Sequence, residues 1–87
     1  MKEIKINNKK IKVTLSVNTT GLYCPMPIVN LKLGLEEVNI DDVVELISDD
    51  PGIKEDLPYW CNTTGNTLLS LKRNKDGIFT GYVKKTT

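Results

Sequence analysis

Hydrophobic residues recur at every second position from residue 11 to residue 17, which read IKVTLSV. These alternating positions lie on one face: Ile11, Val13, Leu15 and Val17. A period of two is typical of a half-buried β-strand. Upstream, Ile4 and Ile6 indicate a short edge strand, with residues 7–10 (NNKK) as the turn.

From Pro25 to about Val38 the hydrophobic period becomes that of a helix. Four hydrophobic residues fall at helical spacing: Ile28, Leu31, Leu35 and Val38. The pattern predicts an amphipathic helix that packs on a sheet and is slightly weakened by Gly34. The β-branched run from Val43 to Ile47 then predicts a strand that is covered on both faces.

A second helical segment follows this buried strand. Asp50 is predicted to cap it, with Pro51 at the first helical position. Asp56 is predicted to cap a second start, with Pro58 tolerated in its first turn, and Gly65 is predicted to end the helix. The residues expected on its apolar face are Leu57, Trp60, Cys61 and Thr64.

The end of the chain predicts a β-hairpin, because residues 67–73 and 77–85 resemble strands on either side of the turn sequence NKDG. The positions expected to be buried there are Leu69, Leu71, Phe79 and Val83. The predicted order is therefore β-α-β-α-β-β. Helices that join strands tend to lie on one face of a sheet. We expect an α/β (α+β) two-layer sandwich, with two helices on one face of a four-stranded mixed sheet.

Length and composition narrow the possibilities. The chain has 87 residues, which indicates a single domain over residues 1–87. Twelve basic and eleven acidic residues give a net charge of +1, so no direct nucleic-acid partner is expected. Lysines near both ends are interpreted as solvated strand edges that hinder aggregation: Lys9, Lys10, Lys12, Lys84 and Lys85. Without a long apolar run or a signal-peptide core, we expect a cytoplasmic protein with no membrane contact.

The chain contains no histidine. This excludes the commonest general base, the usual partner of a catalytic cysteine and most zinc sites. Asp49 and Asp50 are explained more simply by capping of a helix N-terminus than by metal binding. Two cysteines are too few for a disulfide framework. We therefore expect neither a metal ion nor another cofactor.

Cys24 stands at the start of the first predicted helix and is followed by Pro25 and Pro27. With Pro25 at the first helical position, Cys24 takes the N-cap position. Pro27 has no N–H, so the amide of Met26 is the one local donor left for the Cys24 sulfur. The positive end of the helix dipole favours a thiolate here. Such a nucleophile, with no acid or base nearby, suits attack on a sulfane sulfur, and the helix end would also stabilise the persulfide anion.

Both cysteines also have a purely structural interpretation. Cys24 would then be a small capping residue, although Ser or Asp would cap better. Cys61 lies on the predicted apolar face, where free cysteines commonly act as small hydrophobic residues. A resolving cysteine or a second sulfur site is the alternative for Cys61. A disulfide between the two cannot be judged from sequence, because bridge geometry is strict.

Two motifs resemble the TusA/SirA-like sulfur-carrier family. The first reads Gly-Leu-x-Cys-Pro-x-Pro and consists of Gly21, Leu22, Cys24, Pro25 and Pro27. The second begins with Asp49, Asp50 and Pro51 and continues, at the family's spacing, with Asp56, Leu57 and Pro58. The resemblance extends from about Ile11 to Lys85. Two motifs in the family's order make it more specific than the sequence CPMP alone.

The resemblance implies the same two-layer fold and a persulfide on Cys24. The residues expected to position the cysteine are Gly21, Leu22, Pro25, Met26 and Pro27. The family takes sulfur from a cysteine desulfurase or a rhodanese-like donor and passes it to an acceptor protein, towards tRNA thiolation, molybdenum cofactor assembly or sulfur oxidation. Lys32 matches a family position, and Asp50 and Cys61 are further supporting candidates. A solvent-facing helix lysine is the simpler interpretation of Lys32.

Three positions depart from the family pattern. Asn18 stands where Asp is usual, Thr20 where Arg is frequent, and Asn66 where His usually follows the glycine at position 65. The missing charge at position 20 removes one support for an anionic sulfur. It also puts in doubt docking to the donors that other family members use.

These observations favour a sulfur-carrier protein that accepts and donates sulfur through Cys24. Whether such a sulfurtransferase-type carrier is an enzyme is partly a matter of definition, because it turns over only with partners. One alternative is a non-catalytic protein- or nucleic-acid-binding module of the same fold. Another is a thiol redox protein that uses Cys24 and Cys61, for which no C-x-x-C motif is present.

Overall fold

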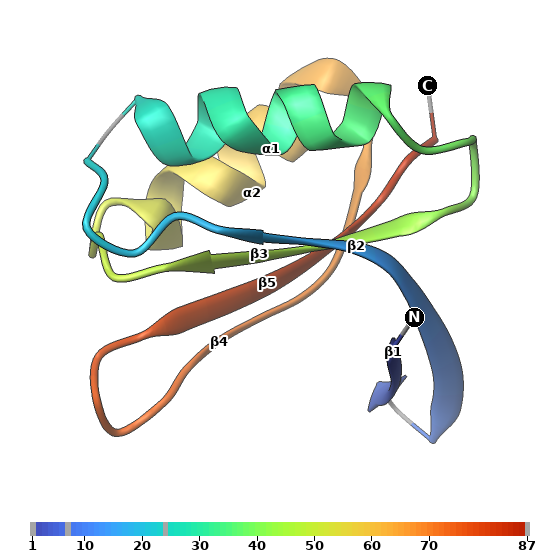
Figure 1. Cartoon of the computed structure of the whole chain (residues 1–87), viewed down its shortest axis with the longest axis horizontal. Coiled ribbons are helices and arrows are strands. Elements are labelled where there is room, and N and C mark those ends of the chain that lie inside the picture. Colours follow the sequence, from blue (N-terminus) through green and yellow to red (C-terminus); the bar gives the residue numbers. More distant parts are fainter. Residues whose placement is uncertain (1, 7, 24, 87) are drawn as a thin grey trace.

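The computed structural model describes residues 2–6, 8–23 and 25–86, which form seven elements in the order β-β-α-β-α-β-β. Five strands make one sheet: β1 (Lys2–Ile6), β2 (Lys9–Asn18), β3 (Val43–Ser48), β4 (Thr67–Arg73) and β5 (Phe79–Lys84). Two helices, α1 (Met26–Glu36) and α2 (Ile53–Thr64), lie together on one face of this sheet (Figure 1). The predicted two-layer arrangement is confirmed.

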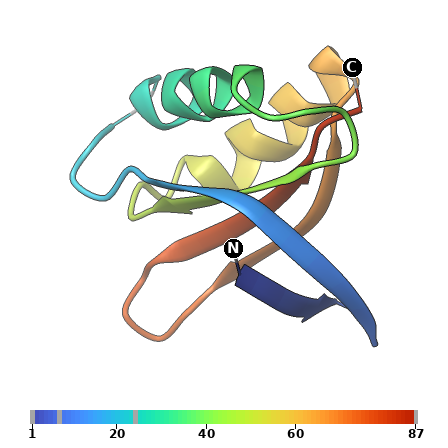
Figure 2. The same cartoon turned by 45° about the vertical axis from the view of Figure 1, so that its right-hand side comes forward.

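The strand order in the sheet is β1-β2-β3-β5-β4. β2 and β3 are parallel and are connected through α1, whereas all other neighbours are antiparallel, so the sheet is mixed. The sheet is twisted, and two parts of it extend away from the helices: β1 with the start of β2, and the hairpin of β4 and β5 (Figures 1 and 2). In the part of the chain that the structure describes, neither helix is long and apolar enough to cross a membrane.

The sheet has five strands, one more than the four predicted. The additional strand is β1, the edge strand that Ile4 and Ile6 indicated. It pairs with β2 along its whole length, from Lys2 to Ile6. The turn between them includes Asn8 at φ 67, a left-handed conformation that asparagine tolerates better than most residues. Two hydrophobic residues are too few for periodicity to establish a strand, and pairing with β2 supplies the missing stabilisation.

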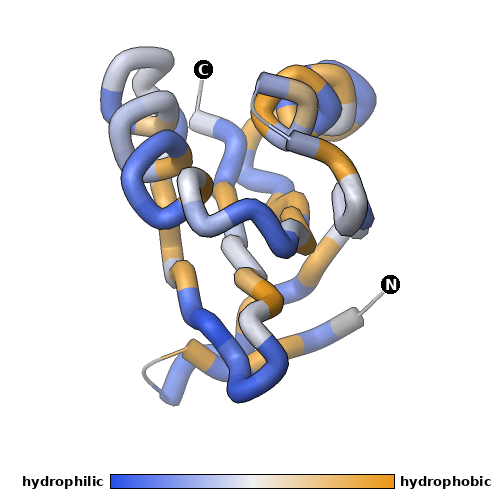
Figure 3. Tube along the Cα trace, turned by 90° about the vertical axis from the view of Figure 1, so that its left-hand side faces the viewer, coloured by the Kyte–Doolittle hydropathy of each residue, from blue (hydrophilic) through white to orange (hydrophobic). Residues whose placement is uncertain are grey.

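α1 starts one residue later than predicted and ends two residues earlier, at Glu36. Four residues were predicted on its inner side. Leu31, Leu35 and Val38 are buried, and Ile28 is half-buried against the core. Gly34 faces the same side, and a β-carbon there would lie 3.0 Å from a methyl group of Val17. The glycine therefore allows α1 to approach β2 closely. α1 is the more hydrophobic helix, mostly orange in Figure 3, whereas α2 is mostly blue or pale.

α2 is one continuous helix from Ile53, so the two predicted starts, at Pro51 and after Asp56, are wrong. Pro58 lies in its second turn, where it removes a single backbone hydrogen bond on the exposed side. The helix continues past Pro58 because its inner face is packed in the core. The buried residues of that face are Ile53, Leu57 and Cys61. Gly65, at φ 82, ends the helix as predicted.

A bulge in β2 changes which residues face the helices. The pairing of β2 with β3 shifts register between Val13 and Leu15. Leu15 and Val17 pack against the core beneath the helices, whereas Ile11 lines a groove on the other side of the sheet. The prediction that all four alternating residues share one face is wrong, because a bulge inserts one residue into the alternation.

A second bulge has the same effect in β4. The pairing of β4 with β5 shifts between Leu68 and Ser70, so Leu68 and Leu71 both pack against the core. Leu69, predicted to be buried, lines the groove on the opposite side of the sheet. The predictions for β5 are confirmed, since Phe79 and Val83 are buried.

β3 is covered on both faces, as predicted, and it carries a buried carboxylate. Glu45 is 2% exposed and accepts hydrogen bonds of 2.8 Å from Ser16 Oγ and of 2.8 Å from the Tyr82 hydroxyl, on the two neighbouring strands. Burial raises the pKa of Tyr82 to about 12, and the hydrogen bond to Glu45 and its negative charge act in the same direction. The carboxylate therefore links the three central strands on the side away from the helices.

This raised pKa predicts a loss of stability at high pH. Tyrosine in an unfolded chain has a pKa of about 10. The contribution of the Tyr82 hydroxyl is therefore complete below pH 10 and is lost as the pH rises through about 12. We expect the difference in free energy of unfolding between the wild type and Tyr82→Phe to shrink over this range in urea titrations. A difference that stays constant from pH 9 to pH 12 would contradict the assigned hydrogen bond.

Candidate functional site

The loop between β2 and α1 contains the first sequence motif and is attached to the end of β3. Thr19 is fully buried, and its N–H and hydroxyl both donate to the carbonyl of Ile47, at 2.7 and 2.6 Å. The N–H of Gly21 donates to Oδ1 of Asp49 at 3.0 Å. Figure 1 shows this loop beside the loop that follows β3, at the left of the molecule. These bonds hold the chain in a defined path towards the first turn of α1.

Local bonds complete the turn of this loop. Gly21 has φ +85, a conformation that favours glycine, and the N–H of Leu22 donates to the carbonyl of Thr19 at 3.1 Å. Oδ1 of Asn18 accepts from the N–H of Thr20 at 3.0 Å and from its hydroxyl at 2.8 Å. The neutral amide oxygen of Asn18 is a sufficient acceptor for these two bonds. Asn18 and Thr20, two of the three departures from the family pattern, are therefore hydrogen-bonded to each other.

Cys24, the predicted nucleophile, lies outside the described residues. The N-cap of α1 is Pro25, with φ −95 and ψ 9, so the prediction that Pro25 is the first helical residue is wrong. The N–H of Met26, predicted to be left for the Cys24 sulfur, donates to the carbonyl of Tyr23 at 2.8 Å. This bond closes a turn before the helix and moves the start of α1 to Met26.

The first turn of α1 is shaped by two prolines. Pro27, buried at the second helical position, has no N–H, and the N–H of Val29 donates to the carbonyl of Pro25 at 3.0 Å. The N–H groups of this turn point towards the preceding loop, where the positive end of the helix dipole lies.

Exposed hydrophobic side chains surround this loop. Leu22 is 36%, Tyr23 74% and Met26 44% exposed. A groove of about 510 Å³ lies between α1 and α2 on the same end of the molecule, and it is lined by Pro25, Ile28, Asp56, Tyr59, Trp60 and Thr63. The motif residues therefore lie beside an apolar surface rather than in an enclosed polar cleft.

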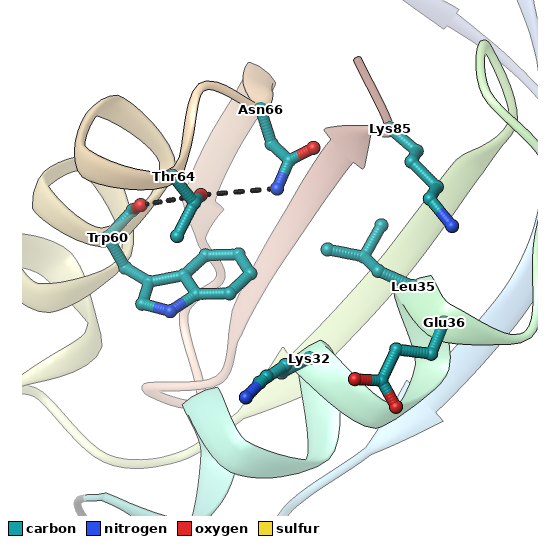
Figure 4. A pocket seen from close by; sticks show the side chains of 7 residues that line it. All are labelled: Lys32, Leu35, Glu36, Trp60, Thr64, Asn66 and Lys85. Carbon is teal, nitrogen blue, oxygen red and sulfur yellow. Dashed lines mark hydrogen bonds between the residues drawn. The ribbon is translucent and has the colours of Figure 1, made fainter. Parts of the chain in front are cut away.

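Lys32 lines a different pocket, of about 280 Å³, near the end of α2 (Figure 4). The residues around it are Lys32, Leu35, Glu36, Trp60, Thr64, Asn66 and Lys85. Of the described residues, none from the loop between β2 and α1 lines this pocket. Asn66 donates to Thr64 Oγ1 at 3.1 Å and accepts from the N–H of Thr86 at 3.1 Å, so it fastens the end of the chain.

The two remaining candidates have structural roles. Cys61 is 2% exposed on the inner face of α2, and burial raises the pKa of its thiol to about 11. Asp50 shapes the turn before α2, since its Oδ1 accepts the N–H of Gly52 at 3.0 Å and its carbonyl accepts that of Ile53 at 3.1 Å. In residues 2–6, 8–23 and 25–86, no three cysteine or acidic side chains are grouped as metal ligands.

The Asp49–Gly21 bond is a site feature that sequence reasoning assigned to helix capping instead. We expect Asp49→Ala to accelerate amide hydrogen exchange at Gly21 by up to about tenfold, because a hydrogen bond of this kind contributes roughly 0.5–1.5 kcal/mol. Asp76→Ala, in the turn between β4 and β5, is the matched control and should leave exchange at Gly21 unchanged. Equal exchange rates at Gly21 in both variants would mean that Asp49 does not hold the loop.

The groove beside the motif was also missed from the sequence. Its residues on α2 recur at positions 56, 59, 60 and 63, a helical spacing that marks one face. That spacing could be read from the sequence. The contribution of Pro25 and Ile28 to the groove could not, because only the packing of α1 beside α2 brings them to this face.

Comparisons with known proteins agree with the geometry. Residues 15–85 match the family model described as "Sulfurtransferase TusA". A protein of Archaeoglobus fulgidus named "Putative sulfur carrier protein" is 31% identical over 78% of this chain and 88% of its own. A "Putative sulfur carrier protein" of Neisseria meningitidis is 35% identical over 79% of this chain and 92% of its own. The crystal structure of a SirA-like protein from Desulfitobacterium hafniense superposes with a TM-score of 0.74 at 17% identity, over 85% of this chain and all of that one.

Proposed function

Because the chain belongs to the TusA sulfurtransferase family, we propose that it carries sulfur as a persulfide on Cys24 and relays it from a donor protein to an acceptor protein. In this proposal Cys24 is the only residue that changes covalently. The residues that position it are Gly21, Leu22, Pro25, Met26 and Pro27. In this proposal Cys61 is not a carrier, since it is buried and burial raises the pKa of its thiol to about 11.

The observation that carries the proposal is that α1 starts at Met26, two positions after Cys24 in the sequence, and follows a loop that is hydrogen-bonded to the end of β3. A helix N-terminus carries a partial positive charge, which lowers the pKa of a neighbouring thiol and favours an anionic sulfur.

The proposed reaction needs a thiolate but no general acid or base. The Cys24 thiolate attacks the terminal sulfur of a donor persulfide, a new S–S bond forms on Cys24, and the S–S bond of the donor breaks. The donor cysteine leaves as a thiolate with the electron pair of that bond. In the second step an acceptor thiolate attacks the outer sulfur on Cys24 and regenerates its thiolate. Neither step consumes an oxidant or a reductant, which suits a chain without histidine.

The donor in this proposal is a cysteine desulfurase or a rhodanese-like protein, and the acceptor is a second protein. The pathways to which such a relay belongs are tRNA thiolation, molybdenum cofactor assembly and sulfur oxidation. Persulfide chemistry requires a reduced thiol, so a reducing compartment such as the cytoplasm fits this role.

The proposal is tested by loading and discharge of sulfur. The reduced protein is incubated with cysteine and a cysteine desulfurase, or with polysulfide, and its intact mass is measured. We expect the mass to increase by one or more sulfur atoms and to return to its starting value with reductant. After removal of the donor, cyanide should release about one thiocyanate per chain, because cyanide accepts sulfane sulfur. A chain that gains no mass with either donor would refute the proposal.

A further inference from the structure

One hairpin of the sheet has an excess of positive charge. It consists of β1 and the start of β2, and it extends away from the helices (Figures 1 and 2). Residues 2–12, which we call the N-terminal arm, contain five lysines and one glutamate, a net charge of +4. The rest of the chain has seven basic and ten acidic residues, a net charge of −3. The overall charge of +1 therefore conceals a strongly basic arm.

The strand register places two lysines of the arm directly opposite each other. Lys5 of β1 pairs with Lys10 of β2, and both residues are exposed. Side chains at directly opposite positions of antiparallel strands lie about 5 Å apart, and like charges there destabilise the sheet. Protection of a sheet edge from aggregation needs one charged side chain and does not require a second one opposite it. The lysine pair therefore has a cost in stability that edge protection leaves unexplained.

Lys12 lies on the same face of the arm as Lys5 and Lys10, because side chains alternate along a strand and paired residues share a face. The residue opposite Lys12 is Glu3, and both are exposed. The isoleucines of the arm lie on its other face and are half-buried. The arm is thus an amphipathic hairpin with three lysines on its exposed face.

A groove of about 530 Å³ extends this basic surface towards the centre of the sheet. Lys10 and Lys12 line it together with Lys84 of β5. Two carboxylates also line the groove. Asp41 lies 3.6 Å from Nζ of Lys84, and Asp42 accepts a backbone N–H at 3.0 Å. These carboxylates thus have partners other than the lysines of the arm.

We propose that the N-terminal arm binds a nucleic-acid duplex through its phosphate backbone. Phosphates placed against the exposed face offset the repulsion between Lys5 and Lys10, because each lysine then lies beside a negative charge. The inference goes beyond the proposed function and does not rest on it. The match to the sulfurtransferase family begins at residue 15, after the arm.

Three features of the arm favour a duplex over other anionic partners. Its exposed face has no apolar side chain for a protein partner to cover, and lysine is depleted at the core of protein–protein interfaces. Residues 2–12 include no aromatic residue on which the bases of a single strand would stack. The turn sequence NNKK has no apolar residue either, whereas a protein that binds a membrane surface inserts apolar side chains into the lipid.

The test measures the binding of a short fluorescein-labelled DNA duplex by fluorescence anisotropy at several salt concentrations. With phosphate contacts from Lys5, Lys10 and Lys12, the logarithm of the binding constant should fall with the logarithm of the salt concentration with a slope of about −2.7. Lys5→Gln/Lys10→Gln should weaken binding by about tenfold or more and reduce the slope to about −0.9. The same variant should unfold at a higher urea concentration than the wild type, because the like-charge pair is removed.

The matched control is Lys32→Gln/Lys54→Gln, which removes the same charge from one exposed lysine in each helix. Its affinity for the duplex should stay within about twofold of the wild type, with an unchanged salt slope. Equal weakening in the two double variants would overturn the inference, because the net charge rather than the arm would then explain the binding. A lower urea midpoint for Lys5→Gln/Lys10→Gln would contradict the repulsion between the two lysines and overturn it as well.

Other anions serve as competitors for the same surface. The wild type should bind the duplex more tightly than either of its single strands, and more tightly than vesicles that contain phosphatidylserine. Tighter binding of a single strand, binding confined to the vesicles, or no binding of the duplex at low salt would each overturn the inference.

Discussion

Sulfur loading is expected to disappear when Cys24 is replaced by Ser and to persist when Cys61 is replaced by Ala. A serine hydroxyl is not ionised near neutral pH and cannot hold a persulfide. Cys61 cannot substitute for Cys24, because it is 2% exposed and its thiol has a pKa of about 11. The measurement is the intact mass of each variant after identical incubation with polysulfide.

Cys61→Ala also serves as the control for folding. It should lower the free energy of unfolding by about 1 kcal/mol, because a small buried side chain is truncated within the core. The circular dichroism spectra of both variants should match that of the wild type. Retained loading in Cys24→Ser, or lost loading in a folded Cys61→Ala, would reverse the assignment of the two cysteines.

The second large effect concerns the contact between α2 and β5. Leu57 is fully buried in the core, and Leu57→Ala is expected to lower the free energy of unfolding by about 2–5 kcal/mol. Gly81 lies opposite it on β5, where a β-carbon would be 2.6 Å from Cδ2 of Leu57. Gly81→Ala is therefore expected to destabilise the protein by about 1–3 kcal/mol through overpacking. Urea unfolding measures both effects.

The double variant Leu57→Ala/Gly81→Ala tests this contact directly. Removing the leucine side chain vacates the volume into which the new methyl group must fit. The double variant should therefore lose less stability than the sum of the single variants, by roughly 0.5–3 kcal/mol. Strict additivity of the two losses would show that the contact does not limit the packing of α2 on the sheet.

The inner faces of the elements were predictable, and their irregularities were not. Leu31, Leu35 and Val83 follow regular periods and are buried as predicted. The bulges near Thr14 and Leu69 break the alternation of β2 and β4. Neither position is a glycine or another residue whose type would indicate a bulge in the sequence. A bulge is determined by pairing with the neighbouring strand and by packing under the helices, which are properties of the tertiary structure. β1 was uncertain for the same reason, since its stabilisation comes from β2.

At the site, the sequence identified the motif but placed the helix start one residue too early and assigned the wrong acceptor to the Met26 amide. The helix start depends on where the carbonyl of Tyr23 lies, and this carbonyl takes the Met26 amide. Asp49 could be assigned to helix capping, because two adjacent aspartates before a proline fit that role. Its actual partner, the N–H of Gly21, is 28 positions earlier in the chain. Bonds between distant loops of this kind arise from the parallel arrangement of β2 and β3 and have no local sequence signal.

Peptide mapping of the wild-type protein, after loading with a desulfurase and cysteine at neutral pH, shows which cysteine carries the transferable sulfur. We expect the added sulfur on the peptide that contains Cys24, and an unmodified thiol mass for the peptide that contains Cys61. Added sulfur on Cys61, or loading that leaves the Cys24 peptide unmodified, would contradict the assignment of Cys24 as the carrier.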